Sequence, residues 1–247
     1  MLLSVAEFAR DASMCPELAG SRVLITGVGS QSGVDLVRAF GDHGCRLILQ
    51  IPDPCAETDA LLEIVAEAAL EVRVHHDDIG EPAEAVKFTQ ASTKAYGALD
   101  VVVNVISFDA AAFEGLESFE AIEDEVVAQM QSAARITQVA ANRMGLMWSN
   151  GLVLNILRMP APDSTSDQAL AGIARALLAA MTRSEAQKWA EQGVRVNAIA
   201  PRLTLKRQAT LYDDFLKSEP EIAAAALYLA SDQGRELTGH ILDCDCS

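Results

Sequence analysis

Residues 18–49 read LAGSRVLITGVGSQSGVDLVRAFGDHGCRLIL, and this stretch decides the fold. It opens with a β-branched apolar run, RVLIT, which is followed by a turn rich in glycine and serine. A helical pattern then leads to a second apolar run, CRLILQI. A strand, a tight turn, a helix and a second strand in this order predict a βαβ unit with parallel strands.

Further apolar runs follow along the chain and alternate with longer helical patterns, at residues 71–76, 99–107, 151–157, 194–201 and 239–244. Their apolar residues are continuous instead of alternating, which is typical of strands that are buried on both faces. The sequence therefore predicts an α/β fold: a doubly wound, Rossmann-type sheet of seven parallel strands with helices on both faces. We assign residues 20–247 to this single domain and residues 1–19 to an N-terminal capping segment. Residues 160–168, PAPDSTSDQ, are expected to form a loop at the carboxyl edge of the sheet.

Composition and charge exclude several classes of function. The net charge of −16 opposes binding to nucleic acid and to anionic membrane surfaces. The five cysteines form no CxxC pair, so we expect neither a disulfide framework nor a metal site, and a reducing cytoplasm fits best. No run approaches the ~18 consecutive apolar residues that a membrane-spanning helix needs. The first residues also lack the basic start and apolar core of a secretory signal.

Landmarks from residue 20 to the C-terminus resemble the short-chain dehydrogenase/reductase family. The turn TGVGSQSG is similar to the family's TGxxxGxG and keeps Thr26, Gly27 and Gly33. LDVVVNVIS resembles LDVLVNNAG and retains Asn104, while HDDI around Asp78 resembles the Asp-apolar pair that lies near adenine. GVRVNAIAP and the closing PEIAAAALYLASDQGRELTGH resemble the family's last strands and helix. The resemblance implies a Rossmann fold and NAD(P)-dependent oxidoreduction.

Two cofactor-binding positions depart from the family pattern. Gln31 stands at the middle glycine, where a side chain occupies the space of the pyrophosphate at the helix N-terminus. Ile51 stands at the end of the second strand, where an acidic residue would bind the ribose of NAD. Asp53 could replace that residue, but the prolines on either side of it fix its direction. We therefore expect this chain to bind no dinucleotide, with the vestigial cleft marked by Gly27, Gln31, Gly33, Ile51, Asp78 and Asn104.

The catalytic positions depart as well. The family uses an asparagine, a serine, a tyrosine that transfers the proton, and a lysine one helical turn later that lowers the tyrosine's pKa. Matching the family's spacing puts Gln129 at the asparagine, Arg158 at the serine, Ala171 at the tyrosine and Arg175 at the lysine. No YxxxK occurs anywhere in the chain. We therefore expect no catalytic residue: Ala171 has no proton to give, and the Arg175 guanidinium stays charged at neutral pH.

The surfaces that build oligomers in this family look intact. Residues 169–181, ALAGIARALLAAM, carry small apolar residues that allow close helix packing, and the helix before them keeps an apolar stripe. The leading hypothesis is an inactive subunit that assembles with an active short-chain dehydrogenase paralogue into a heterotetramer with two copies of each. The partner would bind NAD and oxidise a secondary alcohol, such as that of an aromatic hydroxyacyl-CoA.

Two alternatives stay open. The chain could be a ligand or nucleotide sensor, in which Arg158 and Arg175 bind an anion in the degenerate cleft. It could also be an oxidoreductase with relocated catalytic residues, which requires a new acid and a new ribose contact together.

Overall fold

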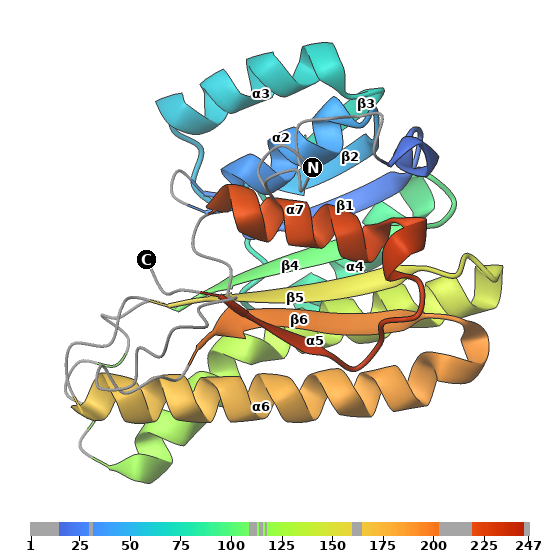
Figure 1. Ribbon diagram of the computed structural model, residues 1–247. Helices are drawn as coiled ribbons and strands as arrows, with labels where there is room; N and C mark the ends of the chain where they lie inside the picture. Colours follow the sequence, from blue (N-terminus) through green and yellow to red (C-terminus); the bar gives the residue numbers. More distant parts are fainter. Residues whose placement is uncertain are drawn as a thin grey trace, which may run out of the picture.

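The strands form one parallel sheet. The computed structural model describes residues 15–29, 32–108, 113, 116, 118–159, 165–202 and 219–244. The strands within these residues are β1 (Arg22–Thr26), β2 (Arg46–Gln50), β3 (Glu71–His75), β4 (Val101–Ser107), β5 (Leu152–Arg158), β6 (Arg195–Pro201) and β7 (Ile241–Cys244). They pair in the order β3-β2-β1-β4-β5-β6-β7 (Figure 1). The predicted seven-stranded Rossmann-type fold is therefore confirmed.

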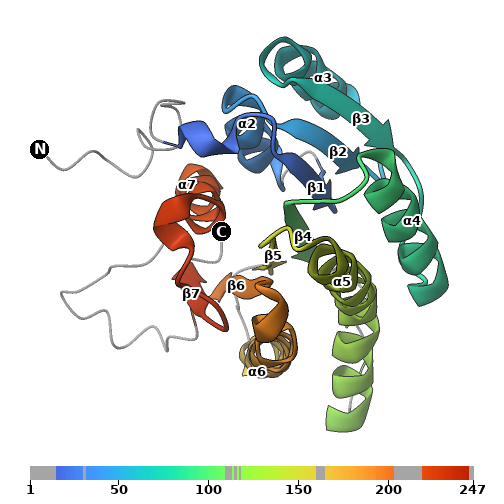
Figure 2. The same ribbon diagram turned by 90° about the vertical axis from the view of Figure 1, so that its right-hand side faces the viewer.

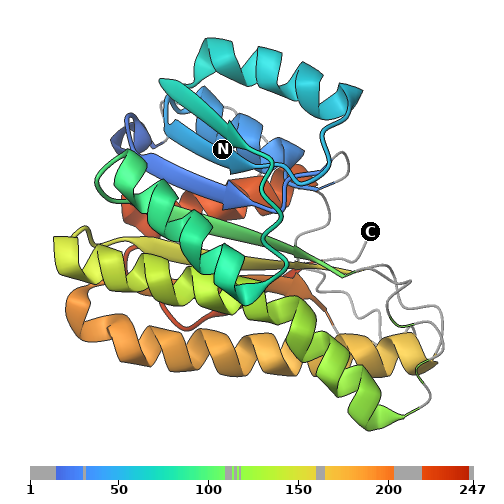
Figure 3. The same cartoon turned by 180° about the vertical axis from the view of Figure 1, so that it is seen from behind.

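Helices cover both faces of the sheet. The helices on one face are α2 (Val34–Asp42), α3 (Ala56–Ala68) and α7 (Glu219–Ala230), and those on the other are α4 (Pro82–Ala95), α5 (Phe119–Met147) and α6 (Thr165–Trp189) (Figures 2 and 3). Short 3-10 turns are η1 (Pro16–Leu18), η3 (Ala190–Gln192) and η4 (Asp232–Gly234). The strand order reverses between β1 and β4, so a cleft is expected at their carboxyl ends.

Burial on both faces explains the continuous apolar strands. All residues of β4 up to Ile106 are buried, and so are all residues of β5 before Arg158. One core cluster lies between the sheet and α2 and α7, and two more lie beneath α4, α5 and α6. The polar Gln50 is buried at the end of β2 although the strand is otherwise apolar after its first residue.

The prediction that residues 160–168 form a loop is wrong for residues 165–168. Residues 160–164 lie outside the described part, but Thr165–Gln168 form the first turn of α6. Ser, Thr and Asp favour helix starts as well as loops, and Asp167 in the first turn complements the helix dipole. The proposed capping segment also falls mostly outside the described residues, although Cys15 and Leu18 are buried in the core. Among the described helices, none combines the length and the apolar character needed to cross a membrane.

Candidate functional site

The cleft between the carboxyl ends of β1 and β4 is hollow. A cavity of about 470 Å³ is bounded by the β1 turn at Gly27, by Pro52, by the Asp78–Gly80 turn and by Asn104–Ser107. Gln129 and neighbouring residues of α5 close its far side. The structure therefore brings Gly27, Asp78, Asn104 and Gln129 to one cavity, at the switch point of the sheet.

The retained residues of this cleft are engaged in holding the fold. The Asn104 Nδ2 donates to Asn155 Oδ1 at 2.8 Å, and Thr26 Oγ1 donates to Asn104 Oδ1 at 3.1 Å. Gly27 has a positive φ of 73°, and a Cβ there would lie 2.2 Å from the Val105 carbonyl oxygen. These contacts join β1, β4 and β5, so the family residues at these positions have a structural role in this chain.

Asp78 stabilises its own turn by a hydrogen bond to the backbone. The exposed Asp78 carboxylate accepts a hydrogen bond from the Gly80 N–H at 2.8 Å, which is an Asx-type turn. On α5, the Gln129 Nε2 donates to Glu125 Oε1 at 2.8 Å, while its Oε1 is shielded and has no partner among the described residues. Gln129 therefore lines the cleft with an amide whose oxygen accepts no hydrogen bond from the described residues.

The position predicted to contact the ribose carries an apolar side chain, Ile51. Ile51 is fully buried in the core, and Asp53 is exposed and does not line the cavity. A residue that the sequence analysis missed, Gln50, spans this region instead: its Oε1 accepts from the Gly27 N–H at 2.7 Å, and its Nε2 donates to the Asp77 carbonyl at 2.9 Å. A single polar residue at the end of an apolar strand was the available signal.

A second residue that the sequence analysis missed is Glu219, which contacts the start of α2. Gly33 is the N-cap of α2, and its N–H donates to Glu219 Oε1 at 2.8 Å. The other carboxylate oxygen, Glu219 Oε2, lies 2.8 Å from Arg158 Nη1. Arg158, at the family's serine position, is thus paired with an acidic side chain of this same chain. Gln31 lies outside the described residues.

Comparison with known proteins identifies the family. Residues 27–246 match the family model described as enoyl-(acyl carrier protein) reductase. The chain belongs to the short-chain dehydrogenase/reductase family.

Relatives in this family are oxidoreductases that span nearly all of the chain. Galactitol 2-dehydrogenase (L-tagatose-forming) of Cereibacter sphaeroides is 29% identical, over 92% of this chain and 94% of the relative. Peroxisomal 2,4-dienoyl-CoA reductase of Pongo abelii is 27% identical, over 94% of this chain and 85% of the relative. An NADH-dependent reductase solved in complex with NAD has the same fold, with a TM-score of 0.72, 20% identity, and coverage of 92% of this chain and 96% of the other.

The positions that the family's spacing assigns to the tyrosine and the lysine, Ala171 and Arg175, lie on α6. Ala171 is 4% exposed and packs in the core cluster that includes Leu157, Met159 and Ala198. The Arg175 Nη1 donates to the Pro201 carbonyl at 2.8 Å and to the Ala200 carbonyl at 3.3 Å, and Nη2 pairs with Asp243. Arg175 therefore fastens α6 to the ends of β6 and β7, through an acidic partner that the sequence analysis did not anticipate.

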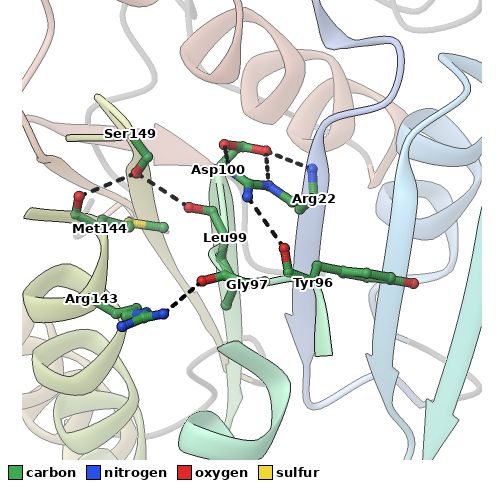
Figure 4. Close-up of polar contacts among 8 residues, drawn as sticks. All are labelled: Arg22, Tyr96, Gly97, Leu99, Asp100, Arg143, Met144 and Ser149. Carbon is green, nitrogen blue, oxygen red and sulfur yellow. Dashed lines mark hydrogen bonds and ion pairs between the residues drawn. The ribbon is translucent and has the colours of Figure 1, made fainter. Parts of the chain in front are cut away.

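A larger cavity, of about 720 Å³, lies at the opposite edge of the sheet, where the strands begin. Two of its lining residues, Asp100 and Ser149, are held by neighbouring residues (Figure 4): the Arg22 Nε and Nη2 donate to the two Asp100 carboxylate oxygens at 2.8 and 2.6 Å. This hydrogen bonding raises the pKa of Arg22. Ser149 donates to the Leu99 carbonyl, and Arg143 to the Gly97 carbonyl. We attribute these contacts to anchoring of the strand ends.

No group of three or more His, Cys, Asp or Glu side chains is placed to hold a metal ion within the described ranges. Of the two C-terminal cysteines, Cys244 is buried at the end of β7 and Cys246 lies outside those ranges.

Proposed function

We propose that this chain is a catalytically inactive subunit that assembles with an active short-chain dehydrogenase paralogue. The observation that carries the proposal is Ala171, a buried methyl group packed into the core at the position of the proton-transferring tyrosine. Of the described tyrosines, neither Tyr96 nor Tyr228 lines the cleft. The positions next to the reaction centre carry Arg158 and Arg175, and each guanidinium is paired with an internal carboxylate.

An apolar groove between α5 and α6 supports assembly. The groove holds about 360 Å³ and is lined by Val127, Met130, Gln131, Ala134, Leu177, Ala180, Met181 and Ser184. Small residues on both helices, Ala134 and Ala180, allow another helix pair to approach closely. A water-exposed groove of this composition is stabilised when a second subunit covers it.

The partner would supply the chemistry. In this proposal NAD binds to the paralogue, which oxidises a secondary alcohol, and the present chain completes the heterotetramer. The sequence also resembles the non-catalytic subunit of 2-(hydroxy(phenyl)methyl)succinyl-CoA dehydrogenase of anaerobic toluene degradation. On that resemblance, the partner's substrate is an aromatic hydroxyacyl-CoA. This chain would contribute contacts and no reacting group.

The decisive experiment is reconstitution with a short-chain dehydrogenase that keeps YxxxK and is encoded beside this chain. We expect the two proteins to co-elute in size-exclusion chromatography with the mass of a heterotetramer. We also expect NAD reduction by the complex and none by this chain alone. Separate elution of the two proteins would remove the proposal. NAD reduction by the isolated chain would instead support relocated catalytic residues.

The hollow cleft favours one second candidate, a ligand sensor. The support for an anion site in such a sensor is weaker than the sequence suggested, because Arg158 and Arg175 are each paired with a carboxylate of their own chain. Calorimetric titration of the isolated chain with NAD, NADH, NADP and an acyl-CoA separates the candidates. Tight binding supports the sensor, and its absence supports the subunit.

A further inference from the structure

The N-terminus of α2 is the phosphate end of the cleft. The first N–H groups of a helix lack partners within the helix, and the helix dipole adds partial positive charge there. In dinucleotide-binding folds the pyrophosphate lies at this place. Here the Gly33 N–H already donates to Glu219 Oε1 at 2.8 Å. A carboxylate of the chain itself thus occupies hydrogen-bonding space that a phosphate oxygen would need.

Arg158 holds this carboxylate from the other side. Its Nη1 lies 2.8 Å from Glu219 Oε2, and the two side chains are only 18% and 19% exposed. Arg158 ends β5 beside Ser107 of β4, at the carboxyl edge of the sheet. The contact therefore runs from the central strands, through the first residue of α7, to the start of α2. Breaking this half-buried pair is unfavourable, because either partner alone would leave an unpaired charge that is largely shielded from water.

We propose that Glu219 is an internal anionic plug that excludes the phosphates of a dinucleotide from this chain, with Arg158 as the residue that holds it. The inference deepens the proposed function and rests on it in one respect: a subunit without chemistry has no need of its own cofactor. It also accounts for a charged Arg158 at a position that faces substrate in the family. The plug covers the phosphate end only and leaves the cavity at Asp78 and Asn104 open.

The plug repels phosphates in two ways. Its oxygen takes the Gly33 N–H, and its negative charge opposes a second anion in the same space. Removal of the side chain frees the N–H and also frees the Arg158 guanidinium, which can then pair with a phosphate. Binding of a pyrophosphate-bearing nucleotide should therefore increase when Glu219 is removed, whereas binding of adenosine, which has no phosphate, should not change.

Calorimetric titration of the full chain with ADP and with adenosine tests the proposal. We expect Glu219→Ala to bind ADP at least tenfold more tightly than the natural sequence, with no difference for adenosine. Glu67→Ala, which removes an exposed carboxylate from α3, is the charge-matched control and should leave ADP binding unchanged. Equal ADP affinity in Glu219→Ala and the natural sequence would overturn the plug.

A double variant covers the case in which Glu219→Ala fails to fold around the unpaired Arg158. In Arg158→Met/Glu219→Ala both charges are absent, so no buried charge is left alone. It should still bind ADP more tightly than the natural sequence, by a smaller factor than the single variant because the guanidinium is lost. No gain in the double variant would overturn the plug.

Each variant is also mixed with the active paralogue. Co-elution without any gain in ADP binding would remove the plug and leave the subunit proposal standing. A gain in ADP binding without co-elution would support the plug and contradict the subunit proposal.

Discussion

Residues that spacing assigns to the family's reacting positions have structural partners in this chain. Arg175, at the lysine position, binds two carbonyl oxygens at the end of β6 and the Asp243 carboxylate of β7. A guanidinium suits this task because it donates several hydrogen bonds in fixed directions. Its contribution is therefore to the stability of the sheet edge beside α6.

Removal of the Arg175 guanidinium should destabilise the fold. We expect Arg175→Ala to lower the free energy of unfolding by about 2 kcal/mol, since hydrogen bonds to charged groups contribute roughly 1.5–3 kcal/mol. Chemical denaturation measures the change, and Arg183→Ala, an exposed arginine of the same helix, is the control. An equal effect of both substitutions would contradict the assigned role.

Cys45 illustrates how burial changes a single thiol. Burial raises its pKa from an ordinary value of 9.0 to about 12. The folded chain therefore keeps this proton up to about pH 12, whereas the unfolded chain releases it above pH 9. Because the folded state then binds more protons, the free energy of unfolding should fall as the pH rises between these values.

Thermal melting of the natural sequence and of Cys45→Ala between pH 8 and about pH 11 checks this expectation. The loss of stability with rising pH should be smaller in the variant. In the folded natural sequence, Cys45 should also resist alkylation at neutral pH, unlike the half-buried Cys55. Rapid alkylation of Cys45 without unfolding would contradict its burial.

At the scale of elements, α5 and α6 are the part of the molecule best suited to contact another subunit. The two helices pack against each other, and their outer apolar groove includes the exposed Val127 and Ala180. Another face of α6 points to the core, because Ala171 and Ala174 are buried there. The same helix therefore has a core face and an apolar outer face.

A charge placed in this groove should prevent assembly while leaving the fold intact. We expect Ala180→Glu to weaken the complex with the active paralogue at least tenfold, because burying a carboxylate in an apolar interface is unfavourable. Ala66→Glu, at an exposed alanine on α3, should leave the complex unchanged. Sedimentation equilibrium of the mixtures measures both. Unchanged assembly of Ala180→Glu would place the interface elsewhere.

At the scale of the whole molecule, the family fold is present, and our proposal concerns specific points of its cleft. The sheet order, the switch point and the cavity beside Asn104 are those of a Rossmann-type domain. The phosphate end is occupied by Glu219, and the ribose position carries the buried Ile51. The molecule therefore combines a Rossmann-type architecture with a cleft in which Gly33 and Arg158 are bonded to Glu219 of the same chain.

Local sequence patterns were sufficient for the strands and for most of the helices. The central strands β4 and β5 are short, continuous apolar runs because they are covered on both faces, and this property is visible without knowledge of the partners. The edge strand β3, EVRVH, is only partly buried and less continuous. The start of α6 was missed because the Ser, Thr and Asp residues after Ala161 favour a loop and a helix N-terminus equally. The assignment of Gln129, Arg158, Ala171 and Arg175 to the family's reacting positions rests on spacing alone and stays a prediction.

By itself the sequence determined the βαβ order, the parallel sheet and the absence of a YxxxK pair, since each depends on residues close together in the chain. Only the tertiary structure decided what the substituted residues do. Glu219 lies 186 positions from Gly33, and Asp243 lies 68 positions from Arg175. Contacts over such separations depend on how the sheet stacks its helices, and neither hydrophobic periodicity nor motif spacing records which charged side chains then meet.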